Sequence, residues 1–277
     1  MQIEIIEMEE TRCKFLLKDA SPADANALRR TLISDIPKMA IDHVEFHLGP
    51  IMDNEKEYES VTPLFDEQVA HRLGLVPIPT DLELMNFREE CVCGGEGCPN
   101  CIVMYSLNKI GPCTVYSGDL IPLGNDSFRI RDTLIPIVDL NEGQAVLIYA
   151  TAEMGTAKRH VKWQVTNGVG YNYLPTVEID YDLCDYGMTC VKSCPRKVFD
   201  IVDGKPIVAR ILDCSICKTC AEDCDQNAIT VTADPHNLLF SFETDGSLSA
   251  ATTLKTALEI LEEKFKKFEE MVSSLEN

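Results

Sequence analysis

The sequence predicts an α+β protein in which a core domain, made from both ends of the chain, carries two insertions. Three observations point to this fold class. Helical periodicity marks one segment near the N-terminus and a longer segment at the C-terminus; short strand-like runs fill the middle; and cysteines gather in two clusters. Because the two helical ends bracket everything else, we expect them to pack in one core domain, with the middle inserted between them.

The composition is that of an ordinary globular protein with an acidic surface. The chain has 277 residues, of which 45% are hydrophobic and 25% charged, so it is long enough for two or three domains. We find no membrane-span run and no signal peptide, and thirteen cysteines without an export signal favour a reducing, cytoplasmic location. The formal charge of −20 would repel phosphate backbones, which argues against direct binding of nucleic acid.

The N-terminal segment is expected to form a hairpin and then a short helix. Residues 3–19 contain strand-like stretches broken by charge. Ser21 is expected to be the N-cap of the helix, with Pro22 at its first position and Asp24 three residues past the cap. Apolar residues then recur at helical spacing until Pro37 ends the run: Ala25, Leu28, Leu32 and Ile36.

The C-terminal segment carries the strongest periodic signal in the chain. From Ser247 onward, apolar residues alternate by three and four, which predicts a long helix with a narrow heptad seam: Ala251, Leu254, Leu258, Leu261, Phe265, Phe268, Val272 and Leu275. Such a seam packs against the protein's own body or against another subunit. The sequence leaves both interpretations open.

The middle of the chain, roughly residues 40–180, is expected to be rich in β-structure. Strand-like runs lie near 113–123, 128–139, 145–152 and 159–180, with turn signals between them. His43 and His47 have the spacing of a helical metal pair, but the alternating pattern around them favours a strand with polar surface residues. We find no Walker loop, dinucleotide-binding glycine motif or HExxH, and therefore predict no catalytic residues in this chain.

The cysteines of residues 184–224 form an internal repeat with an offset of 30 residues. The second run, 214–224, has the spacing C-x2-C-x2-C-x3-C of bacterial ferredoxins, whereas the first run has Gly187 where the second has a cysteine. In two-cluster ferredoxins the fourth cysteine of each run binds the other cluster. This rule predicts a complete [4Fe-4S] site at Cys194, Cys214, Cys217 and Cys220, and a second, incomplete site at Cys184, Cys190 and Cys224.

The incomplete site leaves its cluster type open. Three thiolates suit a [3Fe-4S] cluster, or a [4Fe-4S] cluster with water or a nearby oxygen at the fourth iron. Asp185 is the nearest carboxylate, although its spacing differs by two residues from that of the missing cysteine. Zinc binding and buried thiols are the alternatives for all seven cysteines. Zinc prefers two C-x2-C pairs, however, and the 214–224 run crowds too many sulfurs together for one tetrahedral ion.

A second cysteine cluster, CVCGGEGCPNC at 91–101, has a different pattern. Cys91, Cys93, Cys98 and Cys101 surround a glycine-rich stretch, which lets four sulfurs turn inward around one small ion. Tetrahedral Zn²⁺ in a structural role is the favoured interpretation, and a redox-active thiol pair is the alternative.

Motifs outside the cysteine clusters resemble the signature of the RNA polymerase assembly-subunit family, which includes bacterial alpha, the eukaryotic third-largest subunit and their archaeal counterpart. These motifs are NALRR at 26–30, followed by Ala40 and Val44, and DEQVAHRLGLVPI at 66–78. Residues 160–175 are similar to the segment where that family's insert domain returns to its dimerisation domain. The span 49–65 is longer than the corresponding span of the family signature. Together with a ferredoxin-like insert, the resemblance to the archaeal branch of the family covers nearly the whole chain.

The resemblance implies a domain organisation. An alpha-subunit-like dimerisation domain is expected from residues 1–44, 160–180 and 226–277. The β-rich insert domain would span 45–159 and include the zinc loop at 91–101. A small ferredoxin-like iron–sulfur domain would span 181–225.

The resemblance also implies partners. The chain would form a heterodimer with subunit L through its two helices and, with subunits N and P, support the large catalytic subunits. Arg29 and Arg30 are candidates for contacting the second-largest subunit, and the heptad residues Leu254, Leu258, Leu261, Phe265 and Phe268 for contacting subunit L. The family's catalytic magnesium lies in another chain, so this chain would belong to a DNA-directed RNA polymerase, a nucleotidyltransferase, without catalysing the reaction, and would meet DNA only through the complex.

Two other functions are considered beside assembly. A ferredoxin-type electron carrier would use the clusters directly, but Gly187 breaks one motif and no flavin or nicotinamide motif accompanies them. A sensor, in which oxidation of a cluster limits polymerase assembly, is the third hypothesis.

Overall fold

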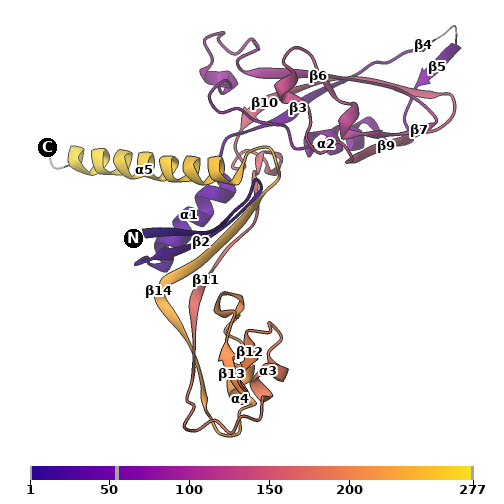
Figure 1. The fold of residues 1–277 in the computed structure, drawn as a ribbon. Coiled ribbons are helices and arrows are strands. Elements are labelled where there is room, and N and C mark those ends of the chain that lie inside the picture. Colours follow the sequence, from indigo (N-terminus) through magenta and orange to yellow (C-terminus); the bar gives the residue numbers. More distant parts are fainter. Residues whose placement is uncertain (1, 54–55, 276–277) are drawn as a thin grey trace. The chain divides into compact units, whose positions relative to one another are not determined.

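The computed structural model describes residues 2–53 and 56–275, which form a mixed α+β fold (Figure 1). The helices of four or more residues are α1 (Pro22–Ser34), α2 (Asp66–Gly74), α3 (Thr189–Ser193), α4 (Thr219–Glu222) and α5 (Ala250–Leu275). The strands are β1 (Gln2–Met8), β2 (Arg12–Lys18), β3 (Lys38–Phe46), β4 (Ile51–Asp53), β5 (Lys56–Ser60), β6 (Ile102–Ile110), β7 (Cys113–Tyr116), β8 (Ile121–Pro122), β9 (Pro136–Leu140), β10 (Gln144–Gly155), β11 (Thr166–Ile179), β12 (Phe199–Val202), β13 (Lys205–Val208) and β14 (Ile229–Thr244).

The chain divides into two compact units, which are described separately. Within the described residues, the first unit comprises 2–7, 14–27 and 170–241. The second comprises 8–13, 28–53, 56–169 and 242–275. Each unit is therefore built from segments that are far apart in the sequence.

The first unit contains most of a four-stranded sheet with the order β1-β2-β14-β11. The neighbouring positions of β1 and β2 confirm the N-terminal hairpin expected from the sequence. The ring of Phe15 on β2 stacks on Phe240 of β14 with centroids 5.0 Å apart, and Tyr171 of β11 stacks on the same ring at 6.1 Å. Because Phe15 and Phe240 are fully buried, this aromatic layer joins three strands through one small core.

Helix α1 begins where the sequence predicts. The backbone N–H of Asp24 donates to the Ser21 hydroxyl at 3.3 Å, and the backbone N–H of Ser21 donates back to the Asp24 carboxylate at 2.9 Å. This reciprocal arrangement satisfies two amide groups at the helix start. The predicted apolar residues are all buried: Ala25, Leu28, Leu32 and Ile36.

The second unit is organised around β10, the central strand of a six-stranded sheet. β10 pairs antiparallel with β6 and with β3, and parallel with β5. The main core of this unit includes side chains from β6, β10 and α2, among them Tyr105, Leu107 and Leu73. The Tyr105 hydroxyl donates to the carbonyl oxygen of Phe128 at 2.7 Å, so the one polar atom of this buried ring is satisfied.

Several strand predictions for the middle of the chain differ from the structure. The run at 128–139 becomes a strand only at Pro136, after a 3₁₀ turn at Asp126–Phe128. In the run at 159–180, a 3₁₀ turn at Val161–Trp163 precedes β11. The favoured interpretation of His43 is confirmed, because it lies exposed on β3, where its ring nitrogen Nε2 contacts Glu45 at 3.2 Å.

The segment that returns to β11 is anchored by Trp163, the only tryptophan in the chain. Its ring is fully buried against Gly155, where a Cβ atom would lie 2.4 Å from the ring, and its Nε1–H donates to the carbonyl oxygen of Glu153 at 3.1 Å. The cations of Arg159 and Lys162 lie 4.7 and 4.3 Å from the ring centroid. The packing therefore requires glycine at 155 and fixes where the chain leaves β10.

Across the described ranges 2–53 and 56–275, none of the helices combines the length and the apolar character that a bilayer crossing requires.

Candidate metal centres and an exposed helix face

Residues 91–101 bring four sulfur atoms to one point. The Sγ atoms of the four cysteines all lie within 4.8 Å of one another. Individual pairs are 3.5 Å apart for Cys91 and Cys98, 3.7 Å for Cys93 and Cys101, and 3.9 Å for Cys98 and Cys101. A regular tetrahedron of sulfurs about 2.3 Å from an ion has edges of about 3.8 Å. The loop therefore has the geometry for one tetrahedral metal ion.

The backbone of this loop explains how the sulfurs converge. Gly94, Gly95 and Gly97 have φ values of 68°, 87° and 97°, in the left-handed region that glycine adopts without strain. Arg88 fixes the loop from outside, because its Nε–H donates to the carbonyl oxygen of Gly95 at 2.9 Å and its Nη1 lies 3.4 Å from Glu153 of β10. The glycine turns shape the loop, and this arginine joins it to β10 of the sheet.

The thiols of the loop differ in their readiness to ionise. The backbone N–H of Gly97 donates to Cys93 and lowers the pKa of its thiol to about 6, whereas burial raises the pKa of Cys101 to about 12. A thiolate already present at neutral pH gives an incoming cation its first ligand, and binding then releases the protons of the remaining thiols.

The 30-residue repeat of the cysteine-rich segment is visible in its backbone. Helix α3 begins at Thr189 and α4 at Thr219, and the residue before each helix is left-handed. Non-glycine residues with positive φ occur in three pairs separated by 30 positions: Tyr186 and Ile216, Met188 and Lys218, and Lys197 and Asn227. The segment therefore consists of two halves with the same local path, as the sequence repeat predicts.

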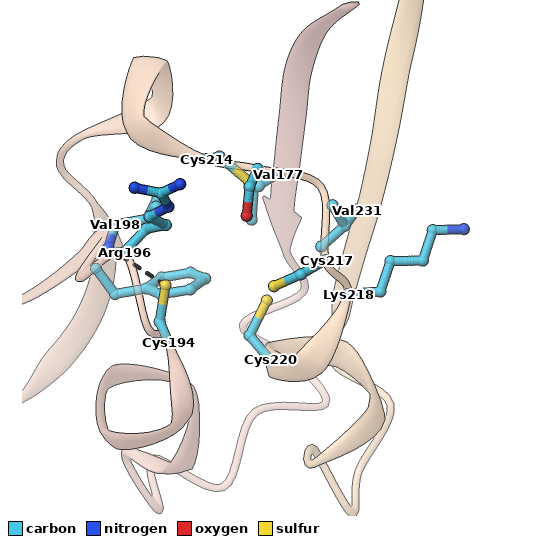
Figure 2. Close-up of a pocket in the computed structure, with 11 residues that line it drawn as sticks. Val177, Cys194, Arg196, Val198, Cys214, Cys217, Lys218, Cys220 and Val231 are labelled. Atoms are coloured by element: carbon cyan, nitrogen blue, oxygen red, sulfur yellow. Dashed lines mark hydrogen bonds between the residues drawn. The ribbon is translucent and has the colours of Figure 1, made fainter. Parts of the chain in front are cut away.

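Four cysteines from both halves line one cavity. The cavity has a volume of about 320 Å³ including open solvent, and it is lined by the four cysteines expected to bind the complete cluster: Cys194, Cys214, Cys217 and Cys220. Figure 2 shows Cys194 facing Cys217 and Cys220 across this space, while Lys218 points away from it. The cysteine contributed by the first half thus lies with three from the second half.

A second cavity contains the remaining three cysteines. Cys184, Cys190 and Cys224 line a space of about 400 Å³ including open solvent, together with Asp185 and Gly187. Here the crossing is reversed, because Cys224 from the second half joins two cysteines of the first. The structure therefore groups all seven cysteines as the ferredoxin rule does, while the identity of any bound metal stays a prediction.

The electrostatics of both cavities favour a bound cation. Burial raises the pKa of Cys220 to about 11, and the neighbouring thiolates of Cys194, Cys214 and Cys217 contribute to this rise. Burial likewise raises the pKa of Cys190, with added contributions from Cys184 and Cys224. Because thiolates gathered in one space repel each other, ions with compensating positive charge would be needed to hold them all ionised. The donor sets fit iron–sulfur clusters on this ground.

The spacing of the sulfurs separates the two kinds of site. Among the residues that the structure describes, the 91–101 cysteines are the one group of at least three His, Cys, Asp or Glu side chains close enough to share a single ion. In an iron–sulfur cube each cysteine binds a different iron, so the sulfurs stand farther apart than around one ion. Among the described residues, no three of the seven cysteines of 184–224 lie close enough to share a single ion in this way.

Helix α5 presents an apolar face that changes character along its length. Leu254 is buried at 6% exposure, and Leu258 and Leu261 are partly buried. Beyond them, Phe265 and Phe268 are 66% and 61% exposed. In the first half of the helix the seam residues from Leu254 to Leu261 are thus buried or partly buried, although Ala251 is exposed, and the seam residues beyond Leu261 are uncovered.

The sequence matches the protein family described as "RNA polymerase Rpb3/Rpb11 dimerisation domain" over residues 14–265. The chain belongs to this family. It is 44% identical to the DNA-directed RNA polymerase subunit Rpo3 of Picrophilus torridus over 272 residues, which cover 98% of this chain and 99% of the relative. It is also similar to the proteins of the same name from Thermoplasma volcanium, at 44% over 96% of this chain and 97% of the relative, and Archaeoglobus fulgidus, at 38% over 99% of each.

The other residues expected to bind partners lie on α1. Arg29 is partly buried and Arg30 is exposed, near the middle of the helix. The contacts expected of these two arginines, like those expected of the α5 seam, would be made with other chains.

Sequence reasoning missed several supports of these sites. It did not identify Arg88 as an anchor of the 91–101 loop, nor Asp35, whose buried carboxylate lies 2.8 Å from Lys158 and also pairs with Lys264 of α5. No local pattern connects such residues, because their partners are distant in the sequence. The only sign in the sequence that Asp35 is buried is its position directly after the predicted helix, among apolar residues.

Proposed function

We propose that this chain is a non-catalytic assembly subunit of DNA-directed RNA polymerase. The observation that carries the proposal is the family match over residues 14–265, together with full-length relatives named as subunits of that enzyme. The absence of catalytic motifs from the sequence is consistent with a supporting role. In this role the chain works in the cytoplasm and meets DNA only through the complex.

The proposed primary partner is the small subunit L. The uncovered apolar side chains at the end of α5 support this pairing. Exposed aromatic residues on one helix face contribute a large part of the binding free energy when a partner buries them. Subunits N and P and the second-largest subunit are the further partners, with Arg29 and Arg30 proposed to contact the last of these.

The proposed domains follow the sequence boundaries. Residues 1–44, 160–180 and 226–277 form the dimerisation domain, 45–159 the β-rich insert domain, and 181–225 the ferredoxin-like domain. The 30-residue repeat in backbone conformation supports the last of these.

The proposed cofactors of the ferredoxin-like domain are two iron–sulfur clusters. Cys194, Cys214, Cys217 and Cys220 bind a [4Fe-4S] cluster, and Cys184, Cys190 and Cys224 bind a second [3Fe-4S] or [4Fe-4S] cluster. A structural role is supported by the small core of this domain, in which two of the six buried apolar residues are themselves cysteines, Cys190 and Cys220. A domain with so little core gains much of its stability from ligation.

Zn²⁺ is the proposed ion of the 91–101 loop. The sulfur separations match four thiolates around one tetrahedral ion, and such a closed shell leaves no position for a substrate. Its proposed role is to hold this loop on the insert domain.

Electron transfer is the less favoured function, because it leaves the family match and most of the chain unexplained. Regulation of assembly through cluster oxidation remains compatible with the assembly role.

A reconstitution experiment tests the structural role of the clusters. We expect Cys214→Ser, in protein prepared without oxygen, to keep pairing with subunit L but to lose recruitment of the large subunits. Cys113→Ser is the matched control, since Cys113 lies in β7 outside both cysteine groups. If Cys214→Ser assembled normal polymerase, the structural role would be wrong.

A further inference from the structure

The incomplete cavity differs from the complete one at a single repeat position. Gly187 occupies the place that Cys217 occupies 30 residues later, on a backbone that is left-handed at the residues on either side in both halves. The backbone of the first half therefore follows the path that holds Cys217 in the second half, but position 187 carries no thiol. Three thiolates remain in the cavity, at Cys184, Cys190 and Cys224.

The carboxylate of Asp185 lies against the position that a side chain at residue 187 would take. A Cβ atom on Gly187 would lie 3.2 Å from Oδ1 and 3.6 Å from Oδ2 of Asp185. The backbone N–H of Gly187 donates to Oδ1 at 2.9 Å, which turns the carboxylate back over this position and leaves Oδ2 available. Asp185 and Gly187 both line the cavity that contains the three cysteines.

We propose that Asp185 supplies the fourth protein ligand of the second cluster, binding through a carboxylate oxygen the iron that Cys217 binds through sulfur in the first. The inference rests on the proposed iron–sulfur function, and it selects a four-iron cluster for the second site. An anionic oxygen replaces an anionic sulfur, so the number of protein charges around the cluster stays the same in the two halves.

Another carboxylate, Asp225, also lines this cavity but occupies a different position in the repeat. It aligns with Pro195, which follows the ligand Cys194 and offers no side-chain donor. Asp185 instead meets the position of the missing thiol. This difference makes Asp225 the matched control for Asp185.

The oxygen-ligated iron has a predictable weakness. Thiolate is the ligand that iron–sulfur clusters use most, and the Asp185 side chain is exposed at the surface of the domain. We expect this iron to be the first one lost on contact with air, which leaves a three-iron cluster held by the three cysteines.

The test uses the full chain, expressed and purified without oxygen, with iron quantitation and EPR spectroscopy. The wild type should hold about eight irons, four for each cube. Asp185→Asn keeps an oxygen that accepts from the Gly187 N–H but removes the anionic ligand. It should hold about seven irons and show the nearly isotropic signal of an oxidised three-iron cluster. Asp225→Asn should match the wild type, and adding Gly187→Cys to Asp185→Asn should restore about eight irons.

Several results would overturn the inference. A wild type with about seven irons needs no fourth ligand, and an Asp185→Asn variant with unchanged iron and EPR signal would assign the position to water or another group. Loss of iron in Asp225→Asn alone would transfer the role to that residue. A wild type without iron at the second site would overturn the second cluster as well, whereas pairing and assembly assays would still test the polymerase function separately.

Discussion

The two halves of α5 carry one sequence pattern and have opposite surroundings. In the first half, the seam residue Leu254 is buried and Leu258 and Leu261 are partly buried, although Ala251 is exposed. In the second half, Phe265 and Phe268 expose about two-thirds of their surface. Periodicity therefore determines which side chains share a face of the helix, but not what covers that face. The second half leaves an apolar face open, and the proposed function supplies a partner chain for it, in keeping with the description of the family as a dimerisation domain.

The largest effect is expected from placing charge on the uncovered half. Phe265→Asp combined with Phe268→Asp should weaken pairing with subunit L by a factor of about 100 or more, because both aromatic anchors are lost. The stability of the isolated chain should change by less than about 0.5 kcal/mol, since both side chains are already exposed. Isothermal titration calorimetry measures the first quantity and urea unfolding the second.

The matched control alters the opposite face of the same helix segment. Glu263→Ala with Lys267→Ala removes an exposed ion pair at 3.5 Å and should leave pairing within about twofold of the wild type. Equal loss of pairing in both double variants would contradict the assignment of the apolar face.

In the covered half, a large effect is expected on the stability of the isolated chain. Leu254→Ala should lower the free energy of unfolding of the isolated chain by about 2–4 kcal/mol, because it leaves a cavity in packed surroundings. The same change at Leu275, which is 84% exposed, should cost less than about 0.5 kcal/mol. Urea unfolding followed by circular dichroism compares the two, and similar costs would abolish the distinction between the halves.

An intermediate effect is expected at Asp35, which pairs with Lys264 near the boundary between the halves. Burial opposes ionisation of this carboxyl, but hydrogen bonds from Lys158 and Lys264 overcome it and lower the pKa of Asp35 to about 2. A carboxyl with a lowered pKa stabilises the folded state above its ordinary pKa near 4 and loses this contribution as the pH falls toward 2.

Asp35→Asn should therefore destabilise the chain by about 1–2 kcal/mol at neutral pH, a range that allows for the solvent exposure of both lysines. The difference between wild type and variant should shrink between pH 4 and pH 2 and be constant above pH 5. Unfolding measured across this range checks the sign, and a difference that grew on acidification would contradict the ion-pair account.

The smallest effect on pairing is expected from removing the Zn²⁺ ion that is proposed for the 91–101 loop. A chelator that strips the 91–101 loop should loosen that loop, whose four sulfurs lose their shared ion. The affinity for subunit L should stay within about twofold of that of the untreated protein, because the loop contributes no residue to the α5 face that is proposed to pair. Calorimetry with the chelated protein checks this, and a large loss of affinity would show that the metal site and the pairing surface are linked.

Local patterns were sufficient for the elements whose causes are local. Ser21 and Asp24 identified the start of α1 because a capping box needs only four consecutive residues. The cysteine repeat predicted which sulfurs share each cavity, since two equivalent halves leave little freedom in their pairing.

Elements that depend on distant contacts were harder to predict. Strand β6 was not identified, although Val103, Tyr105 and Leu107 alternate as a half-buried strand does. Residues 128–135 have strand-like composition, but in the described chain they contain no strand and follow an irregular path up to β9. The spacing of Asp185 in the sequence differs by two residues from that of the missing cysteine, and only the fold shows that its side chain turns back to position 187.

Hydrogen exchange on the full chain, with and without subunit L, tests the central claim most directly. We predict that subunit L slows exchange of the backbone amides in residues 262–275, the uncovered half of α5, and leaves residues 250–261 nearly unchanged because they are already protected. Unchanged exchange in 262–275 within a stable complex would contradict the claim that this helix face pairs the chain with its polymerase partner.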